Sequence, residues 1–143
     1  MKDIVVGFIT GYDFDKIKPW VNSLDRSGFD GTKAMICYNV SYEVTEELVK
    51  RGYTVLGFKK NDEKKRLEYK ENFSIMVDRF LHLWHFLRQS KGEYRYIITT
   101  DVKDVVFQSN PSVWLENHMR DKKINAACES MHYKDEDWGT HNL

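Results

Sequence analysis

Two aspartates stand three residues apart in the segment Asp101-Val102-Lys103-Asp104, directly after the apolar stretch of residues 94–100. That stretch predicts a buried strand, so both carboxylates are expected just beyond its end, where they can turn toward one hard cation. Such cations are held by one or two protein carboxylates and completed by phosphate oxygens and water. The segment therefore suggests a metal and phosphate site. A plain turn, in which Asp101 caps the next segment and Lys103 pairs with a neighbour, is the alternative that these residues leave open.

Apolar runs and turn residues divide the chain into alternating strands and helices. The predicted strands are residues 3–10, 33–38, 54–58, 94–100 and 124–128, with a short strand-like piece at 105–107. The predicted helices run from Asp15 to a stop at Gly28, over residues 42–50, over residues 72–89, and onward from Asn110 and Pro111. Short connections imply right-handed crossovers, so the expected class is α/β, with a Rossmann-like, open, mostly parallel sheet flanked by helices.

The spacing of apolar residues indicates which side chains the helices bury. The expected buried residues are, helix by helix, Ile17, Trp20, Val21 and Leu24; Leu48 and Val49; Met76, Phe80, Leu83, Trp84 and Leu87; and Trp114, Leu115 and Met119. Asn72 is the expected cap of the third helix. His82 and His85 share that helix, but two histidines make a poor metal site, so packing is expected for both. Residues 61–70 are charged without an apolar face and predict a solvated loop or a short helical excursion.

The predicted strand ends suggest where a ligand would bind. In an open parallel sheet, ligands occupy the crevice beyond the carboxyl ends of the strands. Three segments reach that edge: residues 10–12 after the first strand, the Asp101 region after the fourth, and Glu129 after the fifth. Their convergence predicts a site at this edge without naming its ligand.

Composition narrows the classes of partner. The chain has 143 residues, enough for one domain, and its 22 basic and 22 acidic residues give a formal net charge of zero. A nucleic-acid binder or an anionic-membrane binder normally carries a basic surplus, so neither is expected. The longest apolar run, residues 4–9, is too short to span a bilayer, and a strand begins at once after Met1 without a signal peptide. A cytoplasmic chain, or one trimmed of a leader, is expected, with Cys37 and Cys128 as buried reduced thiols.

The stretch YIITTDVKDVVFQSNPSVWL resembles the metal-binding segment of GT-A-fold glycosyltransferases, which carry a DxD-type motif between two short strands. The strand ending in Thr-Gly-Tyr, the arginine-bearing helix and the later segment ESMHYKDEDWGTHNL follow in the order that this family shows. Lys103 occupies the usual place of the second carboxylate, so Asp104 takes that role and the direct metal ligand stays open. A lysine at that place also argues against a haloacid-dehalogenase-type phosphatase.

The resemblance implies roles for single residues. Thr10, Gly11 and Tyr12 would hold the base and ribose of a nucleotide, while Asp101 would contact ribose or metal and Asp104 would bind the metal, Mn²⁺ or Mg²⁺. Arg79 would need an anionic partner, since an unpaired charge near the core is costly. Asp101, the nucleotide, or a purely structural salt bridge each meet that need.

The activity implied is transfer of a sugar from a nucleoside diphosphate-sugar, with a UDP-sugar as the expected donor, to the hydroxyl of a carbohydrate or another acceptor. An inverting enzyme would need a carboxylate base, for which the candidates are Glu129, Asp135, Glu136 and Asp137. Such domains usually run longer, so residues 1–143 are expected to form a single nucleotide-sugar-binding domain, the N-terminal part of a longer enzyme. The alternatives are a non-catalytic nucleotide- or sugar-binding module and a metal-dependent phosphohydrolase.

Overall fold

A parallel sheet of four strands, in the order β3-β2-β1-β6, forms the centre of the protein. The computed structural model describes residues 2–71, 74–90 and 93–126. The strands are β1 (Lys2–Thr10), β2 (Thr32–Tyr38), β3 (Thr54–Leu56) and β6 (Tyr94–Thr100). The predicted α/β class with a parallel sheet flanked by helices is confirmed.

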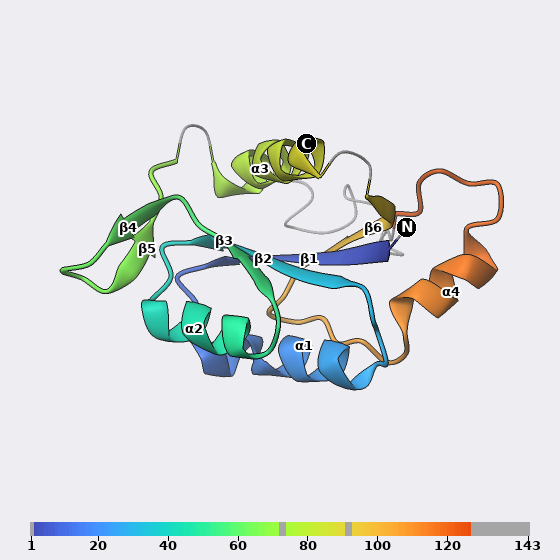
Figure 1. Ribbon diagram of the computed structural model, residues 1–143, viewed down its shortest axis with the longest axis horizontal. Helices are drawn as coiled ribbons and strands as arrows, with labels where there is room; N and C mark the ends of the chain where they lie inside the picture. Colours follow the sequence, from blue (N-terminus) through green and yellow to red (C-terminus); the bar gives the residue numbers. More distant parts are fainter. Residues whose placement is uncertain (1, 72–73, 91–92, 127–143) are drawn as a thin grey trace, which may run out of the picture.

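Helices cover both faces of this sheet (Figure 1). On one face lie α1 (Phe14–Arg26) and α2 (Tyr42–Lys50), on the other α3 (Ile75–Gln89), while α4 (Pro111–His118) lies beyond the amino end of the sheet. Side chains of β1 pack on both faces of the sheet. Val5 and Ile9 belong to the core between the sheet and the α1–α2 layer, and Ile4 and Val6 belong to the core between the sheet and α3. Because both faces are buried, this strand is a continuous apolar run rather than an alternating one.

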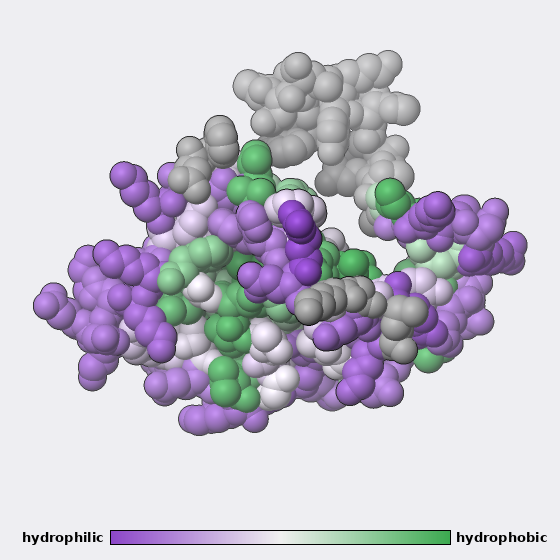
Figure 2. All heavy atoms as spheres, turned by 45° about the horizontal axis from the view of Figure 1, so that its top comes forward, coloured by the Kyte–Doolittle hydropathy of each residue, from purple (hydrophilic) through white to green (hydrophobic). Residues whose placement is uncertain are grey.

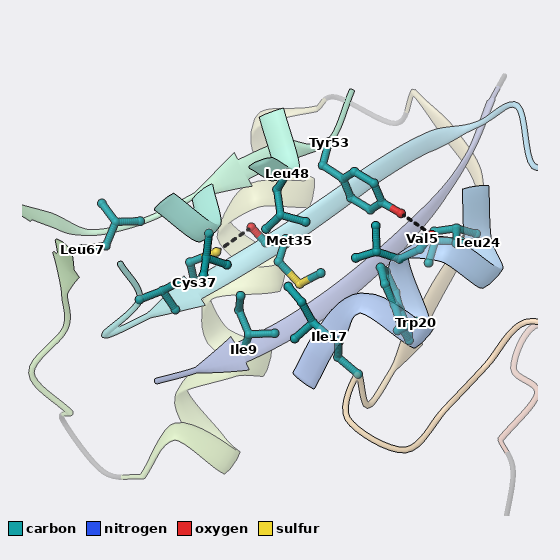
Figure 3. Close-up of a cluster of buried hydrophobic side chains, with 14 residues drawn as sticks. Val5, Ile9, Ile17, Trp20, Leu24, Met35, Cys37, Leu48, Tyr53 and Leu67 are labelled. Carbon is teal, nitrogen blue, oxygen red and sulfur yellow. Dashed lines mark hydrogen bonds between the residues drawn. The ribbon is translucent and has the colours of Figure 1, made fainter. Parts of the chain in front are cut away.

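The larger core lies between the sheet and the α1–α2 layer. Trp20, Leu24, Met35 and Leu48 are fully buried there, and Figure 3 shows them packed around the strands. Cys37 belongs to this cluster, and burial raises the pKa of its thiol to about 12, as expected of an inert buried cysteine. Cys128 lies outside the described residues.

The charged segment 61–70 was expected to be a loop or a helical excursion, and this is wrong. It belongs to an antiparallel hairpin of β4 (Lys59–Asn61) and β5 (Arg66–Glu68), which extends beyond the carboxyl edge of the sheet (Figure 1). Leu67 is the reason: it is buried in the larger core, and its N–H donates to the carbonyl of Val40 at 2.7 Å. Because β5 has one apolar residue, Leu67, between two charged ones, its sequence contains no apolar run that would predict a strand.

The expected buried stripe of α3 is only partly correct. Leu83 is buried and Leu87 packs against the second core, but Met76 is 61% exposed, and Phe80 and Trp84 are also exposed. Asp78 turns inward instead. Figure 2, in which the α3 side comes forward, shows hydrophobic side chains gathered in the middle of this face and hydrophilic ones around the rim. A helix with apolar residues on several sides does not specify its buried face by spacing alone.

The expected cap of the third helix, Asn72, lies outside the described residues, and α3 begins at Ile75 with Ser74 before it. Three further local expectations are wrong. Residues 105–107 form no strand, and the N–H of Phe107 donates to Ser23 Oγ of α1 at 2.9 Å. The described part of the segment 124–128, residues 124–126, is not a strand either. Two expected core residues are exposed: Val49 and Trp114, which stacks on His118.

An ion pair between the buried Asp3 and the exposed Arg95 lies at the amino edge of the sheet. Asp3 is 4% exposed and accepts from Arg95 Nε at 2.9 Å, from Arg95 Nη2 at 2.8 Å and from the N–H of Tyr96 at 3.2 Å. Arg95 also donates to Glu116 at 2.6 Å, so one guanidinium joins β1, β6 and α4. The hydrogen bonds from Arg95 lower the pKa of Asp3 and raise that of Arg95.

Replacing Asp3 with Asn is expected to lower the free energy of unfolding by about 2 kcal/mol at neutral pH, because hydrogen bonds to a charged group are lost. The unfolded chain protonates Asp3 near its ordinary pKa of 3.8, and the folded chain only at lower pH. The stabilisation is therefore complete above the ordinary pKa and is lost as the pH falls through the folded one. Urea unfolding from pH 7 to pH 2 should show the difference between wild type and Asp3→Asn shrinking below pH ~4.

The matched control is Asp15→Asn, because Asp15 is exposed and its ion pair with Lys18 is weak, with 4.0 Å between the charged atoms. It should change stability by less than about 0.5 kcal/mol at any pH. A difference between wild type and Asp3→Asn that stays constant across this pH range would contradict the assignment of the ion pair.

Candidate functional site

A pocket of about 260 Å³ opens beyond the carboxyl ends of β1 and β6. The strand β1 has β2 on one side and β6 on the other, so the order of the chain reverses between β1 and β6. This is the switch point at which open α/β sheets bind ligands. Its lining includes five of the residues expected at the site, namely Thr10, Tyr12, Arg79, Asp101 and Asp104.

The aspartate turn is held in place by Val102. This side chain is 2% exposed and belongs to the core, whereas Asp101 and Asp104 on either side are exposed. A Cβ atom on Gly7 would lie 2.7 Å from Val102 Cγ2, so Val102 fills the space that Gly7 leaves in the central strand. Trp20 Nε1 donates to Thr100 Oγ1 at 2.8 Å and ties the strand end to α1. The two carboxylates therefore project from a fixed turn.

Arg79 reaches the same turn from α3. Its Nη1 donates to Asp101 Oδ1 at 3.0 Å, so the expected pairing with Asp101 is present. The guanidinium packs over the rings of Phe8 and Phe80, with centroids 5.6 and 4.9 Å away. Its side chain is 18% exposed while that of Asp101 is 68% exposed. The arginine is thus fixed by packing, and its carboxylate partner faces solvent.

Gly11 turns the chain at the end of β1. Its φ of 64° lies in the left-handed region, and its N–H donates to the carbonyl of Tyr38 at 3.0 Å. The turn brings Tyr12, the next residue, into the pocket lining, although Gly11 itself does not line it. An aromatic ring at this position offers a face on which a planar base can stack.

Tyr38 forms another part of the pocket wall. Its hydroxyl lies 3.0 Å from His82 Nδ1, and burial raises the pKa of this tyrosine. Burial also lowers the pKa of His82. His82 is therefore engaged with the wall, and His85 lies against the ring of Trp84, as the packing interpretation predicts.

The pocket was expected from its polar residues, and its apolar wall was missed. That wall is formed by Phe8, Ile9, Ile75 and Met76 in addition to Tyr38. The helical spacing of Met76 predicts a core position, so the sequence gives no signal that this residue lines the pocket. The four candidate bases, Glu129, Asp135, Glu136 and Asp137, lie outside the described residues.

The charged groups of the pocket are two acids, Asp101 and Asp104, and two bases, Arg79 and Lys103. Within residues 2–71, 74–90 and 93–126, no three His, Cys, Asp or Glu side chains gather as a set that could hold a metal ion. Two carboxylates on a fixed turn suit a hard cation such as Mn²⁺ or Mg²⁺ only if ligand oxygens and water complete its shell. The donor set fits a metal that arrives with a phosphate ligand.

No family model, no curated protein and no solved structure matches this chain significantly. None of the helices in the part of the chain that the structure describes is long and apolar enough to cross a membrane. A functional assignment therefore depends on the geometry and the chemistry of the site.

Gly7→Ala is expected to displace the aspartate turn, because the new methyl group would press on Val102 Cγ2 and on Met35 Sδ, 2.9 Å away. Overpacking of this kind costs about 1–3 kcal/mol. Urea unfolding should show that loss, and amide resonances of residues 101–104 should shift in a ¹H–¹⁵N spectrum.

The double variant Gly7→Ala with Val102→Ala provides the control, because it removes the methyl group that the new Cβ meets. The double variant should lose less stability than the two single variants together. Additive losses would show that Gly7 and Val102 are not coupled, and that another contact positions the turn.

Proposed function

We propose that this chain is the nucleotide-sugar-binding domain of a metal-dependent glycosyltransferase of the GT-A type, which moves a sugar from a nucleoside diphosphate-sugar, expected to be a UDP-sugar, to an acceptor hydroxyl. The observation that carries the proposal is the pocket at the switch point, with Tyr12 on the β1 side and Asp101 and Asp104 on the β6 side. The base of a nucleotide would contact the ring of Tyr12 there, and its diphosphate would contact a metal held by Asp101 and Asp104.

Each residue has a part in this proposal. Tyr12 stacks on the base, and Asp101 accepts a hydrogen bond from the ribose or binds the metal. Asp104, with Asp101, would hold Mn²⁺ or Mg²⁺. The metal would supply positive charge to offset the charge of the diphosphate leaving group. Arg79 adds a guanidinium to the anionic side of the pocket, where its fork geometry suits phosphate oxygens.

The acid-base step belongs to a carboxylate that accepts the proton of the acceptor hydroxyl, if the enzyme inverts. The four candidates in the C-terminal segment lie outside the described residues, so this step rests on the resemblance alone. Donor binding and sugar transfer are therefore separate parts of the proposal, and the experiments below address donor binding first.

Thermal unfolding with UDP, GDP, CDP and ADP, each with Mn²⁺, with Mg²⁺ and with chelator, tests the donor site. A ligand at about 100 times its dissociation constant adds roughly 2.7 kcal/mol, which raises Tm by several degrees. We expect a shift with one nucleotide that requires metal and disappears in Asp104→Ala.

Asp121→Ala is the matched control, because Asp121 is exposed and does not line the pocket. It should keep the full metal-dependent shift. Absence of a shift with all four nucleotides would refute the proposed donor site, and a shift that persists in chelator would refute the metal.

Arg79→Gln distinguishes a ligand-binding role from a purely structural salt bridge. Since a charge-assisted hydrogen bond contributes about 1.5–3 kcal/mol, loss of the guanidinium should weaken nucleoside diphosphate binding by about ten-fold or more. Isothermal titration with the nucleotide found above measures this.

The control on the same helix is Arg88→Gln, because Arg88 lies over the ring of Trp84 and outside the pocket lining. It should leave the affinity unchanged. Equal affinity in Arg79→Gln and wild type would leave Arg79 with a structural role only.

A further inference from the structure

A second pocket lies at the same edge of the sheet, between the end of β2 and the β4–β5 hairpin. Its volume is about 340 Å³, and we call it the hairpin pocket; it is lined by Asn39, Lys59, Arg66, Glu68, Tyr69 and Lys70. It shares no lining residue with the candidate nucleotide pocket. The segment that forms most of it was expected to be a solvated loop, so no role was assigned to it.

The hairpin pocket carries a local surplus of positive charge in a chain whose net charge is zero. Three cationic side chains, Lys59, Arg66 and Lys70, face one carboxylate, Glu68. Glu68 is already engaged by Asn61 at 3.0 Å and Lys64 at 3.3 Å, and these hydrogen bonds lower its pKa. In the described part of the chain, none of the three cations has a carboxylate within 4.0 Å.

The guanidinium of Arg66 is hydrogen-bonded to the backbone beside the hairpin pocket. Its Nη2 donates to the carbonyl of Asn39 at 2.6 Å, whereas its Nε is buried and has no acceptor among the described residues. The described part of the chain thus supplies one acceptor, the carbonyl of Asn39, to this charged group.

Asn39 turns the chain beside Arg66. Its φ of 54° is left-handed, a region that asparagine adopts more readily than most residues with a side chain, and its Oδ1 accepts from the N–H of Tyr69 at 2.9 Å. Asn39 therefore holds two residues of the pocket lining, Arg66 through its carbonyl and Tyr69 through its side chain.

We propose that the hairpin pocket binds an oxyanion, that is, a phosphate, sulfate or carboxylate group, through the guanidinium of Arg66 and the ammonium groups of Lys59 and Lys70. Arginine forks and lysine charges are the groups that recognise such anions. The site adjoins the nucleotide pocket, because the ring of Tyr38, which lines that pocket, lies 5.0 Å from the ring of Tyr69. The bound group is then a free anion such as phosphate, or the acidic group of a carbohydrate. The inference does not depend on the proposed transferase activity.

Titration of the ¹⁵N-labelled full chain with sodium phosphate, sulfate and acetate, against sodium chloride at equal ionic strength, tests this site. We expect saturable shifts of the amides of Asn39, Arg66 and Tyr69, and none with chloride. Lys59→Gln and Lys70→Gln should each weaken the binding by about ten-fold, the effect of losing one charge-assisted contact. Repeating the titration with a sugar phosphate and with a uronic acid distinguishes free anion from the acidic group of a carbohydrate.

Lys60→Gln is the matched control, because Lys60 neighbours Lys59 on β4 but lines a different pocket. It should leave the binding unchanged. Non-saturable shifts, or an equal loss in Lys60→Gln and Lys59→Gln, would overturn the inference by showing only a general attraction of anions to the hairpin. Nucleotide binding is read at residues 101–104, so failure of one site is distinguishable from failure of the other.

Discussion

The contact between Gly7 and Val102 is the constraint on which the candidate site depends. Gly7 lies in the central strand β1, which pairs along its length with β2 and with β6. Because Gly7 has no side chain, Val102 can enter the core at the point where β6 has just ended. A buried residue inside a turn fixes the exposed residues on either side of it, so core packing determines where Asp101 and Asp104 project.

An arginine–aspartate pair is found at each end of β6, and the two pairs differ in their environment. At the amino end, Arg95 holds Asp3, whose side chain is 3% exposed, and at the carboxyl end Arg79 holds Asp101, whose side chain is 68% exposed. Loss of Arg95 would leave the carboxylate of Asp3 buried without its partner, whereas the solvated carboxylate of Asp101 can exchange its partner at smaller cost. The same chemistry is therefore structural at one edge of the sheet and available to a ligand at the other.

The sequence predicted the buried strands of the sheet well, and it predicted the more exposed elements poorly. β1 and β2 are buried on both faces, so their apolar runs predicted strands directly. The hairpin was missed because Leu67 is its only buried apolar residue, and the buried face of α3 was misassigned because Met76 and Leu83 look equivalent in the sequence. The rule for strand ends predicted the pocket at the carboxyl ends of β1 and β6. The hairpin pocket has no such signal, since charges that converge in space were read as a solvated segment.

Tyr38 lines the pocket at the carboxyl ends of β1 and β6, and its ring contacts Tyr69, which lines the hairpin pocket. Its hydroxyl contacts His82, its ring stacks on Phe58 at 5.3 Å, and it meets Tyr69 edge-on. Closely packed rings have few alternative packings, so a ligand that displaced Tyr38 in one pocket would also press on Tyr69 in the other. By thermodynamic reciprocity, any such effect of the first ligand on the second equals that of the second on the first. The contact between Tyr38 and Tyr69 therefore joins one wall of each pocket, and coupling between the two proposed ligands would have to pass through these two rings.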